Sequence, residues 1–490
     1  MKQSIWRKKP LSAYESDMKN NQLNRVLTKW GLTSLGIGAI IGGGIFTLTG
    51  IAAHDWAGPA LALSFVLAGI GCTFAALCYA EFASILPVEG SAYAYSYGTV
   101  GEFFAWFIGW NLILEYMMGA TTVAVSWSGY LEKFLHLFHL DLPIWLINDP
   151  WSAGAKMGVA GPVPAFNIAA FIITWVVTYV LVRGIKEAAS TNNIIVIVKI
   201  AVVLFVIIFG AFYINPANWS PFIPQEILGD GANVYGFRDG EIHYGITGIV
   251  KAASIIFFAY IGFDAVSTQA GEAINPRKDV PFAIITSLLI CTILYILVSL
   301  VLTGMVKFDQ LDLRAPVASA FASVGLPWAV FLITVAALAG LTSVMLVMML
   351  GQTRIFLGMA KDGLMPGFFK EIHSTFKTPW KSTIMVGGIV SLVAAVTPID
   401  KVSELTSSGT LLAFAMICGA VWILRMREPQ LDRPYKVPAL PVVATLGIVV
   451  NLYLMWNLRT DTKFAFLIWG VLGIIVYFVY SRHRSKLNDM

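Results

Sequence analysis

Long apolar segments, interrupted by short polar stretches, follow one another along most of this chain of 490 residues. A bilayer core about 30 Å thick requires about 20 apolar residues per helix, so the pattern predicts an all-α polytopic membrane protein with twelve transmembrane helices. The expected spans are 31–53, 58–86, 101–129, 165–183, 191–214, 246–272, 280–305, 316–359, 382–397, 403–424, 439–458 and 464–481. The eighth is too long for one crossing, so we expect an outer helix at its start and a cytoplasmic extension at its end.

The composition and the distribution of charge agree with this interpretation. Hydrophobic residues make up 57% of the chain and charged residues 12%, against about 45–50% and about 25% in soluble proteins. With twelve spans both termini lie on one side, which holds 23 of the 33 Lys and Arg residues, while the opposite side holds eight. The positive-inside rule therefore places both termini in the cytoplasm. Because topology accounts for the basic residues, we expect no nucleic-acid partner.

The first span contains an unusual stretch, residues 36–46, with consecutive glycines Gly42, Gly43 and Gly44. Each glycine costs roughly 1 kcal/mol relative to alanine inside a helix, so the helix is expected to come apart here. Opened backbone is tolerated in a bilayer only where it is buried or lines a cavity. The start of a new half-helix suits a carboxylate, and freed carbonyls suit an ammonium. Close helix packing through Gly38 and Gly42 is the alternative, but it does not require three consecutive glycines.

The sixth span has a similar interruption near Phe258 and Gly262. Because spans 1 and 6 are both interrupted, five spans apart, we expect two inverted repeats of five helices. The expected organisation is a cytoplasmic N-terminal arm at 1–30, repeats at 31–214 and 246–424, two further helices at 439–481 and a cytoplasmic tail at 482–490. This step rests on position, because the two halves show no visible sequence similarity.

Three further positions inside the spans are candidates for function. Lys199 stands alone among the aliphatic residues 194–203, and a desolvated lysine can release and regain a proton; the alternative is a lysine that extends to the cytoplasmic surface. Glu115, beside Tyr116 in the third span, can bind a cationic group, serve in a proton path or form a structural hydrogen bond. Phe258 stands at the expected break, where an aromatic ring can close over a substrate, although a lone aromatic is usually part of the core.

Several classes of protein are not indicated. The chain has no phosphate-binding P-loop, no His-Glu-x-x-His, no His/Cys cluster and no nucleophile elbow, so we expect neither an enzyme nor a metal or cofactor. The cysteines Cys72, Cys78, Cys291 and Cys418 all lie in apolar segments, so we expect no disulfide-linked heavy subunit. A small single-span membrane partner is left open.

Residues 36–46, 257–268, 272–277 and 351–364 together resemble the amino acid–polyamine–organocation superfamily, and most closely its bacterial permeases similar to cationic amino acid transporters. The resemblance covers essentially the whole chain. It implies an inverted five-plus-five fold, with the substrate held where helices 1 and 6 are broken and with protons as the coupling ion.

The resemblance also implies roles for individual residues. It implies that the substrate is bound by Ile40, Ile41, Gly42, Gly43, Gly44, Glu115, Tyr116, Phe258, Ala259, Ile261 and Met348. Phe258 is the expected gate, and Ala259 and Ile261 are expected to offer backbone carbonyls. Lys199 matches a lysine that takes the place of a sodium ion in sodium-driven cousins, which makes proton coupling the expected mechanism.

Two positions bear on the expected substrate. Gly43 stands where close relatives often have threonine, and Met348 is bulky where the similar cationic transporters of animals carry a small residue. A bulky apolar side chain shortens the pocket and favours small or neutral amino acids over arginine. We therefore expect a secondary transporter of a bacterial inner (plasma) membrane that imports L-amino acids by proton-coupled alternating access. Neutral or small amino acids are the expected substrates, and cationic ones are left open. An amino acid or amine exchanger and a non-transporting amino acid sensor are the alternatives.

Overall fold

The computed structural model describes residues 5–10, 27–85, 91–184 and 188–488, and it is mostly helical. The main helices are α2 (Lys29–Ile40), α4 (Leu61–Ile85), α6 (Glu102–His136), α9 (Ile168–Arg183), α10 (Ala188–Gly210), α11 (Gly245–Ile256), α12 (Pro276–Met305), α14 (Pro327–Lys361), α15 (Trp380–Val396), α16 (Ile399–Arg427), α17 (Leu440–Trp456) and α18 (Thr460–Val476). The shorter elements are α3 (Thr49–Ile51), α5 (Ser91–Thr99), α7 (Ile144–Ile147), α8 (Pro150–Lys156), α13 (Pro316–Ser323), α19 (Arg482–Arg484) and an antiparallel pair of strands, β1 (Ile227–Leu228) and β2 (Ile242–His243).

Seven helical stretches of the described chain are long and apolar enough to cross a membrane, and α9, α15 and α17 are apolar but shorter. The predicted all-helical architecture agrees with this structure apart from the two short strands, while the number of twelve crossings remains a prediction. The long eighth segment divides as expected into α13 and α14. The apolar pattern does not predict α5, α7 or α8, because each is short and lacks a long apolar run.

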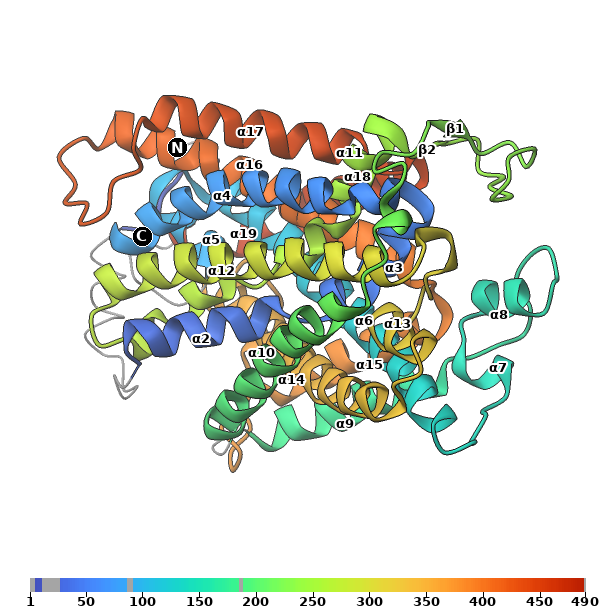
Figure 1. Cartoon of the computed structure of the whole chain (residues 1–490). Coiled ribbons are helices and arrows are strands. Elements are labelled where there is room, and N and C mark those ends of the chain that lie inside the picture. The colour runs from blue at the N-terminus through green and yellow to red at the C-terminus, as the bar shows by residue number, and fades with distance from the viewer. Residues whose placement is uncertain (1–4, 11–26, 86–90, 185–187, 489–490) are drawn as a thin grey trace.

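The helices pack lengthwise against partners that are distant in sequence. α12 lies along α2 and α4, α4 also contacts α17, and α6 lies along α14 and α16. Figure 1 shows α17, α4, α12 and α2 side by side, with α10 and α14 crossing them obliquely. Small residues permit close approach: a Cβ on Gly38 of α2 would lie 2.3 Å from Val196 of α10. Such residues matter in a bilayer, where lipid and helix surfaces are equally apolar.

Both ends of the described chain lie at the same end of the bundle. Arg7 donates to Glu102 at the start of α6 (2.9 Å) and to Asn488 (2.5 Å), and Lys9 forms an ion pair with Asp362 at 3.2 Å. In Figure 1 the termini lie at one end, and α7, α8 and the two strands lie at the other. This arrangement agrees with the expectation that both termini share a side.

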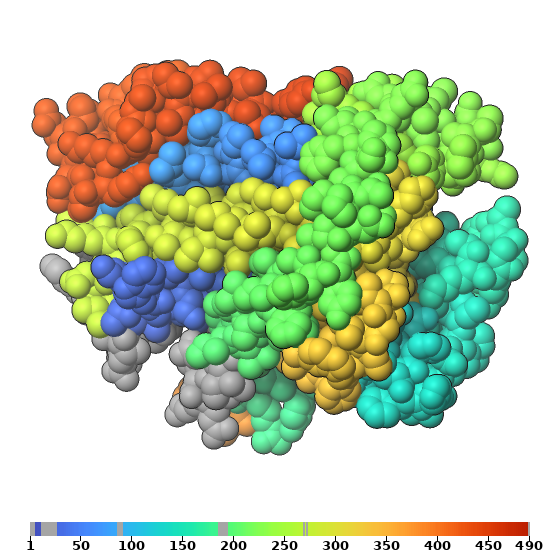
Figure 2. All heavy atoms as spheres, in the orientation of Figure 1, coloured from blue at the N-terminus to red at the C-terminus, as the bar shows by residue number. Residues whose placement is uncertain are grey.

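The outer faces of the helices are strongly apolar. Ile197 and Ile208 on α10, Val449 and Trp456 on α17, and Val479 just after α18 are each more than half exposed. Figure 2 shows α4, α12, α10 and α17 forming one continuous face of the molecule. Apolar surface of this extent is what a lipid-facing helix bundle exposes. The described cysteines are all buried and unpaired, so the structure shows no disulfide among them.

Candidate substrate site

The first interruption lies at the glycine run. α2 ends at Ile40, Ile41 is extended with φ −71° and ψ 102°, and a new helical segment, η1 (Gly44–Leu48), follows. Carbonyls at the end of a helix have no intrahelical partner, so the break frees acceptors in the first half. The amides of Gly42 and Gly43 precede the second half, at the end where the helix dipole is positive.

The second interruption follows α11. A tight turn, η6 (Phe257–Tyr260), leads to an extended Ile261 with φ −60° and ψ 134°, and a further tight helical segment, η7 (Asp264–Glu272), comes after it. Gly262 has φ +124°, a backbone conformation that glycine adopts without steric cost. The helix is therefore opened in the sixth predicted span as well as in the first.

The two interrupted segments contact each other, and their chain directions are opposite. A Cβ on Gly44, after the first break, would lie 2.3 Å from the Cα of Ala259, before the second break. A Cβ on Gly262, after the second break, would lie 2.8 Å from the carbonyl carbon of Ala39, before the first. The interrupted segments therefore cross antiparallel, and glycine allows backbone to approach backbone at both crossings.

Tyr295 of α12 holds the two interruptions together. Its hydroxyl lies 2.8 Å from the carbonyl oxygen of Ile40 and 3.0 Å from that of Ala259, and the side chain is fully buried. Two of the residues expected to meet the substrate through their backbone are thus bonded to the protein in this structure. Ile261, another of them, directs its amide to the carbonyl of Phe258 at 3.1 Å.

Lys199 reaches the first interruption from α10. Its Nζ donates to the carbonyl oxygens of Gly38 (2.6 Å) and Ile41 (3.1 Å). Gly340 of α14 makes room for the stem, since a Cβ there would lie 3.1 Å from Lys199 Cγ. Lys199 has no exposed area, so it does not extend to a solvated surface. Within the described ranges, carbonyls and not carboxylates hold this ammonium.

Unpartnered hydroxyls lie beside the glycine run. A Cβ on Gly43 would lie 2.9 Å from Ser126 Oγ of α6 and 3.7 Å from the ring of Phe258. Ser126 Oγ and Thr47 Oγ1 are buried and have no hydrogen-bond partner among the described residues. Buried polar groups without a partner are uncommon and call for an explanation. Here Ser126 lies against Gly43, and Thr47 lies in the half-helix that follows the glycine run, as expected for groups that a polar ligand completes.

An apolar wall continues from Phe258. A Cβ on Gly119 of α6 would lie 3.5 Å from Met348 Sδ, 3.7 Å from the methyl group of Thr406 and 3.8 Å from the Phe258 ring. Met348 and Phe258 are almost completely buried. The side chains that meet at Gly119 carry no charge, so this wall suits an uncharged group.

Glu115 and Tyr116 lie one helical turn away from Gly119 on α6. The Tyr116 hydroxyl donates to Asp264 Oδ2 at 3.0 Å, and the amide of Gly262 donates to Asp264 Oδ1 at 3.2 Å. Glu115 is fully buried, and neither carboxylate oxygen has a hydrogen-bond partner in the described part of the chain. The structure thus joins Tyr116 to the second interruption, and a role of either residue in substrate binding remains a prediction.

Four residues of this arrangement were missed by reasoning from the sequence: Tyr295, Ser126, Thr47 and Thr406. Each carries a hydroxyl within a helical segment, and such hydroxyls commonly bond the preceding turn of their own helix. No pattern separates them from the many other serines, threonines and tyrosines of the spans. Their importance depends on which helices lie next to each other.

Comparisons with known proteins agree on one family. The chain matches the family model described as amino acid permease over residues 27–480. It is 45% identical to the branched-chain amino acid permease BcaP of Bacillus subtilis over 491 residues, covering all of both chains. It is 42% identical to the methylthioribose transporter of Bacillus subtilis, over 99% of each chain. It is 36% identical to the vacuolar cationic amino acid transporter 4 of Arabidopsis thaliana, over 84% of this chain and 65% of the relative.

Proposed function

Because the chain belongs to the amino acid permease family, a family of transporters and not of enzymes, we propose that it imports neutral L-amino acids by proton-coupled alternating access. The substrate binds between the two interrupted segments, with its carboxylate at residues 42–44 and its side chain against Phe258 and Met348. Lys199 carries the coupled proton.

The opened backbone supports the placing of the amino and carboxyl groups. Amides at the start of a half-helix favour an anion, and carbonyls at the end of the preceding half favour a cation. The hydroxyls of Ser126 and Thr47, which lack partners among the described residues, add polar groups beside the same backbone. A zwitterion satisfies both ends of such a site.

The apolar wall supports a neutral substrate. Met348 and Thr406 meet Phe258 around Gly119, and these uncharged side chains would not replace the hydration that a cationic side chain loses on burial there. The printed names of the relatives span branched-chain amino acids, methylthioribose and cationic amino acids, so the name of a relative alone does not select the substrate.

The two hydrogen bonds of the Lys199 ammonium carry the proposal of proton coupling. A buried ammonium without a counter-ion is costly, and here the carbonyls of Gly38 and Ile41 offset that cost. When the first half of the interrupted span moves during alternating access, these carbonyls leave the ammonium, and release of its proton becomes favourable. Proton binding and closure around the substrate are then linked, and this linkage is reciprocal in binding free energy.

The antiparallel crossing supports the proposed inverted repeats at 31–214 and 246–424, because an inverted pair places its two broken helices in opposite directions. The common location of the chain ends, joined through Arg7 and Asn488, supports a topology with both termini on one side, and the excess of Lys and Arg on that side supports the cytoplasm of a bacterial cell. The identity to the Bacillus permeases supports the plasma membrane as its location.

The test is uptake by the full chain in proteoliposomes, with alanine, leucine, arginine and methylthioribose, each with and without an inward proton gradient. We expect gradient-driven accumulation of alanine or leucine. The variant Lys199→Met keeps a long unbranched side chain, shorter by one heavy atom, and removes its charge, so we expect it to lose accumulation. Lys251→Met is the matched control, since Lys251 lies in α11 but pairs with Glu241, and we expect it to retain accumulation.

The other outcomes are also decisive. Accumulation by Lys199→Met at the wild-type level contradicts the proposed coupling. Uptake that does not depend on the proton gradient but requires amino acid inside the vesicle identifies an exchanger. Binding without any uptake identifies a sensor. Leucine exchange by Lys199→Met, measured with leucine on both sides, shows that the variant is folded and that its defect lies in coupling.

A further inference from the structure

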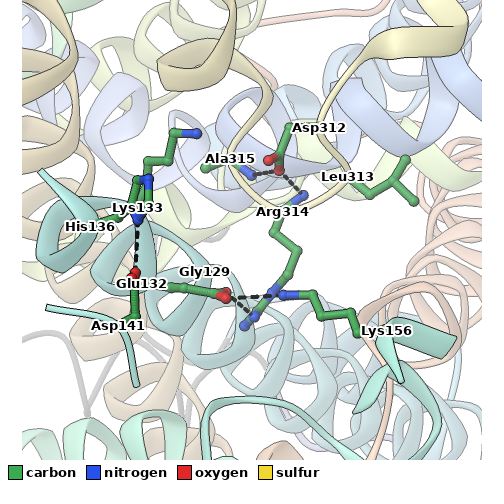
Figure 3. A pocket seen from close by; sticks show the side chains of 10 residues that line it. All are labelled: Gly129, Glu132, Lys133, His136, Asp141, Lys156, Asp312, Leu313, Arg314 and Ala315. Atoms are coloured by element: carbon green, nitrogen blue, oxygen red, sulfur yellow. Dashed lines mark hydrogen bonds and ion pairs between the residues drawn. The ribbon is translucent and has the colours of Figure 1, made fainter. Parts of the chain in front are cut away.

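A cavity of about 370 Å³ opens at the end of α6, beside α8 and the segment that precedes α13. We call it the outer cavity. Figure 3 shows the side chains that line it, most of which are charged. It is lined by Gly129, Glu132, Lys133, His136, Asp141, Lys156, Asp312, Leu313, Arg314 and Ala315. The cavity lies far from the chain termini, because α6 begins at Glu102 beside Arg7 and its 35 residues span about 50 Å.

The ion pairs of the outer cavity involve Glu132 and Asp141 and leave Lys133, among the described residues, without a direct contact to a carboxylate. Glu132 serves two cations, Lys156 at 3.0 Å and Arg314, while His136 pairs with Asp141 at the exposed rim. Lys133 has no hydrogen-bond or ion-pair partner within the described ranges, and in Figure 3 its amino group extends without a dashed line. An anionic group in the cavity would find two ammonium groups: that of Lys156, which shares Glu132 with Arg314, and that of Lys133, which lies near Asp312.

A third carboxylate of the outer cavity, Asp312, is held ionised. Asp312 Oδ1 accepts hydrogen bonds from the amides of Arg314 and Ala315, both at 2.8 Å. Burial by itself would raise the pKa of Asp312, but these amides and the nearby charge of Lys133 outweigh it and hold the pKa below its ordinary value. The cavity therefore offers negative as well as positive charge, which matches a zwitterion better than a simple anion.

Arg314 fixes the geometry of this region. Its guanidinium donates to Asn148 Oδ1 (2.8 Å) and to the carbonyl of Ile147 (3.1 Å), as well as to Glu132. Gly129 lies against it, since a Cβ there would be 3.1 Å from the Arg314 backbone. Arg314 is engaged by these acceptors, whereas Lys133 lies near Asp312 without an ion-pair contact within the described ranges, so Lys133 is the cation that can turn to a ligand.

The outer cavity lies directly outside the candidate substrate site. Lys133 is seven residues beyond Ser126, which places the two on nearly the same face of α6 at a separation of about 10 Å. Between them the Tyr130 hydroxyl donates to the carbonyl of Phe46 at 2.6 Å, and a Cβ on Gly50 would lie 2.4 Å from the carbonyl oxygen of Asp312. These contacts pack protein between the outer cavity and the opened backbone.

We propose that the outer cavity is a docking site for a zwitterionic amino acid, which binds there before the route to the substrate site opens. The α-carboxylate lies against Lys133 and Lys156, and the ammonium lies on the side of Asp312. A cavity of this volume is large enough for a single small ligand. The inference rests on the proposed function, because it takes the same class of substrate, but it concerns a separate site.

A binding experiment tests the outer cavity without relying on transport. Leu313 lines the cavity and is 40% exposed, while the four native cysteines are buried, so Leu313→Cys gives a single accessible thiol for a membrane-impermeant maleimide. We expect millimolar leucine to slow the labelling. The protection is expected to disappear when Lys133→Met is added, and to persist with Lys463→Met, which removes a lysine at the same end of the molecule but outside the cavity.

Two further ligands identify the group that is recognised. 3-Methylbutylamine is leucine without its carboxylate, and we expect it to give no protection. Acetate tests a simple anion, and protection by acetate at the same concentration as by leucine would overturn the zwitterion assignment. Equal protection by the amine, or leucine protection that survives Lys133→Met, would overturn the role of the cation.

Transport kinetics separate this inference from the proposed function. We expect Lys133→Met to raise the KM for leucine about tenfold at low ionic strength, with kcat unchanged, and the wild-type KM to approach that of the variant in high salt. An unchanged KM in a transporting variant contradicts the docking site alone. Absence of uptake by the wild type, with leucine protection of Leu313→Cys intact, contradicts the proposed function alone.

Discussion

Replacing Gly44 by alanine tests whether the two interruptions must touch for the site to form. The new methyl group would lie 2.3 Å from both Cα and Cβ of Ala259. Carbon atoms in contact are about 3.5–4.0 Å apart, so the two segments must separate by about 1.2–1.7 Å. The obstruction is backbone, so no side-chain rotation relieves it.

The cost of this separation opposes the intrinsic effect of the substitution. Overpacking in a closely packed core costs about 1–3 kcal/mol, which corresponds to about 5- to 150-fold weaker leucine binding if the closed site is required. Glycine to alanine inside a helix is otherwise favourable by about 1 kcal/mol. Gly388→Ala in α15, where a Cβ would meet no atom within 4 Å, is therefore the matched control and should be neutral or stabilising.

The assay is equilibrium binding of radiolabelled leucine to the purified chain, with thermal unfolding measured in parallel. We expect Gly44→Ala to weaken binding and Gly388→Ala to leave it unchanged. Adding Ala259→Gly removes one of the two close contacts but leaves Cα in place, so we expect only partial recovery. Leucine binding by Gly44→Ala within twofold of the wild type would refute the requirement for contact between the interruptions.

Two other substitutions probe the same site. Tyr295→Phe removes the hydroxyl that bonds the carbonyls of Ile40 and Ala259, and a buried acceptor left without a donor costs about 1–3 kcal/mol. We therefore expect the variant to unfold at a lower temperature and to be stabilised less by leucine. An unfolding temperature equal to that of the wild type would contradict the bridging role. Met348→Ala enlarges the space beside Gly119. In competition assays we therefore expect bulkier amino acids to inhibit leucine uptake more strongly, relative to alanine, than they do in the wild type. An unchanged order of inhibition would show that Met348 does not limit the pocket.

The approximate positions of the long apolar helices and of both interruptions could be predicted from the sequence, whereas the short α5, α7 and α8 could not. Apolar runs of sufficient length are required by the thickness of the bilayer, and three consecutive glycines weaken a helix in any surroundings. Lys199 was also recognisable, because a single charge among aliphatic residues has few inexpensive positions in a membrane. These features are local, so the chain determines them without reference to its neighbours.

The partners at the site were decided only by the tertiary structure. Tyr295, Ser126 and Gly340 gain their roles from helices that are remote in sequence, and the outer cavity combines α6 with the segments around Lys156 and Arg314. The bond from Tyr116 to Asp264 also joins two helical segments that are distant in sequence. In a soluble protein the polar face of a helix reveals its orientation, but lipid and protein interior are equally apolar. The sequence of a membrane helix therefore shows where it lies along the chain and not which face meets which neighbour.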